Sequence, residues 1–148
     1  MKFHRKQRGV AAVELGILMV ILVPLLFGIT EFGRAIYQFN ALTKSTRDAA
    51  RFLSSQGAGD ANDLATAQNL AVYGQLTSTG TPIVPNLNTA MVAVCDSSSC
   101  PADHQNVPTG SGVINLVTVT VSGYPFTSLV PFVVPSVTFS PISTTMRQ

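Results

Sequence analysis

The sequence has few of the residues that carry catalytic chemistry. Only 11% of its 148 residues are charged, whereas about 25% is usual in a soluble domain. It contains no tryptophan, two histidines and two cysteines. There is no G-x-S-x-G sequence, no phosphate-binding glycine loop and no spacing typical of a nucleophile with its base. The composition therefore predicts a protein that is not an enzyme and that holds no cofactor.

Positive charge is also scarce outside the first nine residues. The whole chain has a net charge of +2, with nine basic and seven acidic residues. Four of the basic residues lie in residues 1–9, so the rest of the chain has five basic and seven acidic residues and a net charge of −2. A domain of that charge offers no electrostatic surface for nucleic acid, which we exclude as a partner. The four basic residues of residues 1–9, here called the leader, are Lys2, Arg5, Lys6 and Arg8.

What the sequence does contain is one long apolar run. Residues 9–34 are apolar over about 21 residues, which as a helix rising 1.5 Å per residue would cross a ~30 Å hydrocarbon core. The basic leader before the run predicts a cytoplasmic N-terminus and an exported C-terminal part. An ordinary secretory signal would be cleaved after the run, but residues 33–38 offer no small-residue site and include Arg34. We therefore expect the apolar segment to remain as a single-pass anchor in the lipid bilayer.

Glu14 lies inside the apolar run, five positions after Gly9. An acidic side chain at the centre of a membrane costs roughly 2.5–3.5 kcal/mol, which makes such a residue a functional candidate by default. In one interpretation Glu14 simply reaches back to the head groups. In the other it needs a cationic partner: cleavage after Gly9 would give Val10 a mostly protonated amino group, which could pair with Glu14 of a neighbouring subunit. Pro24, farther along the run, predicts a helix kink.

A basic leader, a glycine and a glutamate five positions later resemble the class III signal sequence of type IV pilins and pseudopilins, which prepilin peptidases cleave. Beyond this signature, the chain is similar to the TadE-like family of the tight-adherence (Tad) pilus system. The likeness is dense over residues 8–53 and looser in residues 69–74, 124–126 and 146–147. Leu15 follows the glutamate where Flp major pilins typically have tyrosine, which favours a minor, TadE-type subunit. The motifs that carry the likeness are residues 8–14 (RGVAAVE), 23–29 (VPLLFGI) and 31–35 (EFGRA).

The resemblance implies a pilin-like subunit of the bacterial inner membrane, with its C-terminus in the periplasm, that enters an extracellular pilus. It implies cleavage between Gly9 and Val10, and an assembly role for Glu14. The implied partners are the prepilin peptidase, TadF-like and other Tad pseudopilins, the Flp major pilin and the inner-membrane assembly platform. The competing hypothesis is an unprocessed single-pass anchored module that binds or senses a partner.

The pattern predicts an α+β fold in three parts: a leader (residues 1–9), a long helix (10–55) with its N-terminal half in the membrane, and an extracytoplasmic domain (56–148). An apolar stripe at four- and three-residue steps continues the helix beyond the membrane. Gly57 and Gly59 end it, and Asp60 then caps a second short helix with Asp63 in its first turn. The stripe consists of Ala35, Phe39, Leu42, Thr46, Ala49 and Leu53.

The remainder predicts a small antiparallel sheet. We expect strands at residues 91–95 and 117–122, the second with alternating valine and Thr or Ser. A third strand begins at Val137 and changes parity at Pro141, which predicts a bulge or a sheet edge. Residues 129–135 are apolar but interrupted by prolines. They could form core, a subunit interface or a contact with the outer membrane surface, and we favour core or interface.

Cys95 and Cys100 predict a disulfide, because they lie beyond the membrane in an oxidising compartment. For so short a loop the chain-entropy model gives roughly 2 kcal/mol of stabilisation. The alternative is a metal site that adds Asp103 and His104, although C-x4-C-x3-H is not a standard spacing and no fourth ligand is evident. A Cys–His catalytic pair is formally possible, but an oxidised cysteine is not a nucleophile.

Overall fold

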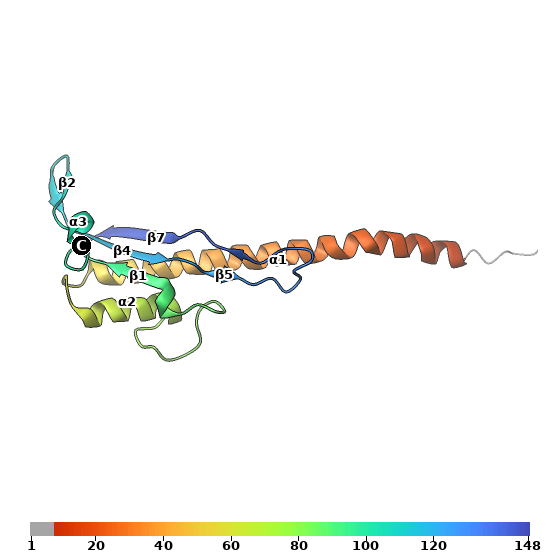
Figure 1. Cartoon of the computed structure of the whole chain (residues 1–148), viewed down its shortest axis with the longest axis horizontal. Coiled ribbons are helices and arrows are strands. Elements are labelled where there is room, and N and C mark those ends of the chain that lie inside the picture. The colour runs from red at the N-terminus through yellow and green to blue at the C-terminus, as the bar shows by residue number, and fades with distance from the viewer. Residues whose placement is uncertain (1–7) are drawn as a thin grey trace, which may run out of the picture.

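The computed structural model describes residues 8–148 and shows an elongated molecule built on one helix (Figure 1). Helix α1, Arg8–Ser54, runs almost the whole length. All the other elements gather around its C-terminal half, while its N-terminal half extends away from them. Apart from Arg8 and Gly9, the leader lies outside the described residues.

The outer half of α1 forms one wall of the domain core. Leu42, Thr46, Ala49 and Leu53 are all buried, as the apolar stripe predicts. One turn earlier the prediction is less accurate, because Phe39 is 45% exposed and its neighbour Gln38 is buried. The helix therefore turns a polar side chain toward the domain where it approaches the membrane segment.

Helix α2, Ala61–Tyr73, packs antiparallel beside the end of α1 and against the sheet. The side chain of Asp60 accepts a hydrogen bond from the N–H of Asn62, which confirms the predicted cap. Gly74 ends the helix in the left-handed conformation, with its N–H donating to the carbonyl of Leu70. The buried face of α2 consists of Ala67, Ala71 and Val72.

A three-stranded antiparallel sheet packs against both α1 and α2. Its strands are β1 (Val92–Cys95), β4 (Leu116–Val121) and β7 (Ile142–Arg147), in the order β1-β4-β7. The valines of β4 are buried and its threonines are partly exposed, so the predicted alternation is confirmed. A 3-10 turn, Thr89–Met91, leads into β1, and the short helix α3, Pro101–His104, follows it. Both helices and this sheet give the expected α+β fold.

The third predicted strand is in fact two strands in two sheets. Strand β6, Val137–Thr138, pairs with β5, Pro125–Phe126, whereas β7 pairs with β4. Pro141 lies between them, and because it has no N–H it suits the point where the chain leaves one sheet for the other. The predicted edge is confirmed, since β7 is the last strand of its sheet. A separate hairpin joins β2, Val107–Thr109, to β3, Gly112–Ile114.

Residues 129–135 connect β5 to β6 and do not belong to the core, contrary to one of the two favoured expectations. Leu129 is 75% and Phe132 83% exposed to solvent. The reason is the pairing of β5 with β6, which carries the connection away from the three-stranded sheet and along α1 (Figure 1).

Candidate functional site: the N-terminal helix and its boundary with the domain

The N-terminal half of α1 presents apolar side chains on all sides. Val20 is 74% and Ile21 70% exposed, and every residue from 9 to 23 is exposed. Since a helix that is apolar all round needs an apolar environment, these residues require lipid or other apolar helices around them. Residues 9–54 are thus a candidate membrane anchor by length and composition.

Gly9, Val10 and Glu14 all lie in the first turns of α1. A Cβ atom added to Gly9 would meet no atom of the described residues within 4 Å, so the described fold does not require a glycine there. The same holds for Gly16 and Gly33. Glu14 is exposed and forms no ion pair or hydrogen bond with the side chains described for residues 9–148. Its carboxylate is therefore available to a partner outside the folded domain.

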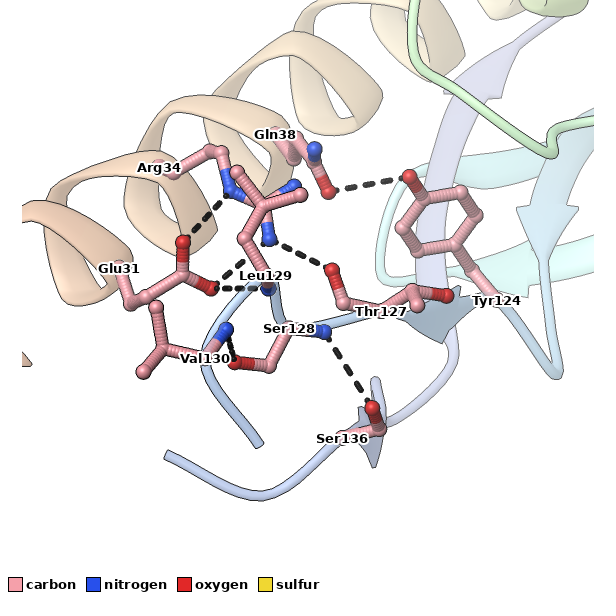
Figure 2. A network of polar contacts seen from close by, with 9 residues as sticks. All are labelled: Glu31, Arg34, Gln38, Tyr124, Thr127, Ser128, Leu129, Val130 and Ser136. Atoms are coloured by element: carbon pink, nitrogen blue, oxygen red, sulfur yellow. Dashed lines mark hydrogen bonds and ion pairs between the residues drawn. The ribbon is translucent and has the colours of Figure 1, made fainter. Parts of the chain in front are cut away.

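Immediately after the uncharged residues 15–30, a buried carboxylate joins α1 to the C-terminal part of the chain (Figure 2). Glu31 is only 2% exposed and lies 2.8 Å from Nη2 of Arg34. It also accepts the N–H of Leu129 at 3.1 Å, and Arg34 donates to the carbonyl of Thr127. The Arg34 guanidinium further lies over the ring of Phe126, at 4.6 Å from its centroid. The hydrogen bond from Arg34 lowers the pKa of Glu31, against the opposing effect of burial.

One turn farther along α1, a second polar contact anchors the segment before β5. The hydroxyl of Tyr124 lies 2.8 Å from the carbonyl oxygen of Pro85 and 3.0 Å from Oε1 of Gln38. The hydroxyl has one proton, so it donates fully to only one of these acceptors. If the amide of Gln38 is turned over, its NH₂ group donates to the tyrosine oxygen and both contacts are satisfied. Burial raises the pKa of Tyr124, partly offset by Arg34, so the hydroxyl stays protonated at neutral pH.

A comparison with protein families finds a match for most of helix α1, to which these contacts bind the C-terminal part of the chain. Residues 9–51 match the family model of the TadE-like protein. The match confirms the resemblance found in the sequence over this part of the chain. It spans α1 from Gly9 to three residues before the end of the helix, so the matched part includes the apolar half and most of the buried outer stripe. No curated protein and no solved structure matches the chain.

The disulfide predicted beyond the TadE-like helix is present. Cys95 and Cys100 are bonded, with their Cα atoms 5.5 Å apart. A disulfide leaves no thiolate for a metal ion, and His104 instead places Nε2 2.8 Å from Oγ1 of Thr118. Within residues 8–148 no cluster of three potential metal ligands occurs.

The turn closed by the disulfide is organised by Asp96, which sequence reasoning did not single out. Its buried carboxylate accepts N–H groups of Gly59 at 2.7 Å, Ser98 at 3.0 Å and Ser99 at 2.6 Å. Burial disfavours the charged form, but these donors outweigh it and hold the pKa of Asp96 below the ordinary value of 3.8. The Asp-Ser-Ser-Ser sequence is a signal for such an Asx turn, although nothing local in it indicates the contact with Gly59.

The structure thus separates the predicted site residues into two groups. Gly9, Val10 and Glu14 lie together at one end of the TadE-like helix, and the cysteines lie in the domain at the other end (Figure 1). Pro24 lies between them, within a continuous helix, and the kink predicted there stays a prediction. Sequence reasoning missed Glu31 as a connector, although its spacing of three residues from Arg34 is a recognisable signal for an ion pair.

Proposed function

We propose that this protein is a TadE-type minor pilin that a prepilin peptidase cleaves after Gly9 and that acts in assembly of a Tad pilus. The observation that carries the proposal is the TadE-like helix itself. Its family match begins at Gly9, which the fold does not need, and the helix exposes an apolar surface on all sides and holds a carboxylate, Glu14, that has no partner among the side chains described for residues 9–148. Each of these features has a use in a subunit that moves from a bilayer into a filament.

In the bilayer, lipid covers the apolar half of α1 while the domain folds outside. Cleavage removes the basic leader, which would otherwise hold the N-terminus at the cytoplasmic surface. The new amino group of Val10 and the carboxylate of Glu14 then carry opposite charges inside an apolar environment. When Glu14 of one subunit pairs with the Val10 amino group of its neighbour, both charges are neutralised. Glu14 therefore selects cleaved subunits and fixes the axial register between neighbouring helices.

The cleavage site lies within the first turn of α1, where the N–H groups have no partners inside the helix. Because such turns open readily, the peptidase can reach the bond between Gly9 and Val10 without disturbing the domain. The other proposed partners are TadF-like pseudopilins, the Flp major pilin and the inner-membrane assembly platform. All of these would meet the protein in the bacterial inner membrane, with the C-terminal domain on the periplasmic side.

Mass spectrometry of the membrane-extracted protein, with and without a prepilin peptidase, tests the proposal. We expect a chain that begins at Val10 only when the peptidase is present. Gly9→Asp should leave the uncut precursor, because the aspartate side chain blocks a subsite shaped for glycine. Gly33→Asp is the matched control, since Gly33 is an equally open glycine of the same helix and should leave cleavage unchanged. A precursor that stays intact with active peptidase would refute the proposal.

The second candidate function is an unprocessed anchored module that binds a partner. An open groove of about 410 Å³ between α1, α2 and the segment after α2 favours it. The groove offers both apolar and charged side chains, including Tyr37, Lys44, Asp48 and Ile83. An intact N-terminus in every sample, together with a ligand that protects this groove from hydrogen exchange, would support this function instead.

A further inference from the structure

We propose that residues 128–136, here called the boundary loop, dip into the outer surface of the bilayer that holds α1. The inference rests on the proposed anchoring of α1 and adds a second membrane contact to it. The loop would contact the head-group region of the leaflet that faces the domain. The boundary loop would therefore act with the helix to fix the height and tilt of the domain above the membrane.

The level of the boundary loop along α1 is the first argument. The N–H of Leu129 is bonded to Glu31, the first charged residue after the uncharged residues 15–30. Val133 lies one turn closer to the N-terminus, because its Cγ1 atom is 3.6 Å from a Cβ built on Gly28. Three residues of helix correspond to about 4.5 Å of depth. The loop therefore lies beside the last turn of the membrane segment, and it is the part of the domain that reaches farthest toward it (Figure 1).

The second argument is the chemistry of the exposed side chains. Leu129 and Phe132 are 75% and 83% exposed, which is unusual for a neighbouring pair of large apolar residues on a soluble surface. No Asp, Glu, Lys or Arg occurs anywhere in residues 104–146, so no charge in this part of the chain opposes entry into lipid. Phenylalanine and leucine are the side chains that interfacial segments insert at the boundary between head groups and acyl chains.

The third argument is the backbone of the boundary loop. Irregular backbone is costly at membrane depth unless its polar groups are paired. Here Pro131 and Pro135 have no N–H, and side chains or turn carbonyls accept most of the other N–H groups, leaving those of Phe132 and Ser136 without a partner in the described part of the chain. The bonds run from Ser128 to the Ser136 hydroxyl, from Leu129 to Glu31, from Val130 to the Ser128 hydroxyl, and from Val133 and Val134 to the Val130 carbonyl. Figure 2 shows those that join Ser128, Leu129, Val130 and Ser136.

Because the chain has no tryptophan, single tryptophans can report the depth of each segment. The full-length protein is reconstituted at low density in vesicles of phosphatidylethanolamine and phosphatidylglycerol, with and without brominated acyl chains that quench tryptophan on contact. Phe132→Trp probes the boundary loop, and Leu129→Trp is an independent second probe. Ile21→Trp probes α1, and Val113→Trp, which replaces a 61% exposed residue of β3, is the control in water.

We expect Phe132→Trp, Leu129→Trp and Ile21→Trp to lose most of their fluorescence in brominated vesicles, and Val113→Trp to lose none. If Ile21→Trp is quenched while both loop probes behave like Val113→Trp, the boundary loop lies in water and the inference is wrong, although the anchor stands. If the loop probes escape bromine but become shielded from aqueous iodide only at high protein density, a second copy covers the loop and the inference is also wrong. If Ile21→Trp is not quenched, the anchoring itself fails.

Discussion

The hydroxyl of Tyr124 connects three distant parts of the chain. Its removal should therefore lower the free energy of unfolding by more than the loss of a single exposed oxygen atom would. Tyr124→Phe keeps the ring, which packs 5.5 Å from the ring of Phe139, and deletes only the oxygen. Gln38 is 5% exposed and would lose a partner that water cannot replace, whereas Pro85 is an exposed residue whose carbonyl can be hydrated. One buried polar group left unpaired costs about 1–3 kcal/mol, which is our expected loss in the free energy of unfolding.

Pulse proteolysis in urea, with the full chain in detergent micelles, measures the folded fraction of the domain. The matched control is Tyr37→Phe, which makes the same change at a side chain that is 70% exposed and should alter stability by less than about 0.5 kcal/mol. Adding Gln38→Leu to Tyr124→Phe should restore part of the loss, because two apolar groups then face each other. A Tyr124→Phe variant as stable as Tyr37→Phe, or a double variant weaker than Tyr124→Phe, would refute the reasoning.

Three further predictions concern carboxylates. Glu14→Ala should leave cleavage by the peptidase intact and reduce piliation, as counted by electron microscopy; normal piliation would remove the role of Glu14 in assembly. Asp96→Asn should destabilise the domain in thermal unfolding at pH 7. Because the folded-state pKa of Asp96 is lowered, its contribution is present above the ordinary carboxyl pKa and disappears as the pH falls through the lower folded value, so the variant and the parent should converge in acid. Glu31→Gln should increase hydrogen exchange at Leu129 while exchange in β4 stays unchanged, and equal effects at both places would show general unfolding instead.

The helical part of the fold was predictable because its signals are local. The apolar run, the stripe along the outer half of α1 and the cap at Asp60 all depend on residues within one or two turns of each other. The stripe was misread only at Phe39, where the buried position belongs to Gln38. A polar residue at such a position gives no periodic signal, since its burial depends on Tyr124, which is 86 residues away.

The C-terminal part was less predictable for a related reason. Strands β5 and β6 have two residues each, too few for an alternating pattern, and Phe126 of β5 pairs with Val137 of β6 across the whole boundary loop. The change of parity at Pro141 was detected, but a bulge and a change of sheet give the same sequence pattern. Likewise, the i, i+3 spacing of Glu31 and Arg34 indicates an ion pair, while the bond from Leu129 to Glu31 joins residues 98 apart and has no sequence signature.

The separation of α1 into two halves has a consequence for genetics. No residue from 9 to 23 is buried against the rest of the protein, so substitutions there remove no contact on which the domain depends. A variant in that half that loses function should therefore still display the disulfide, the folded sheet and normal protease resistance. Phenotypes can then be sorted by position: losses that map to the first half report on what the subunit meets in the membrane or the filament, and losses that map beyond residue 30 must first be checked for misfolding.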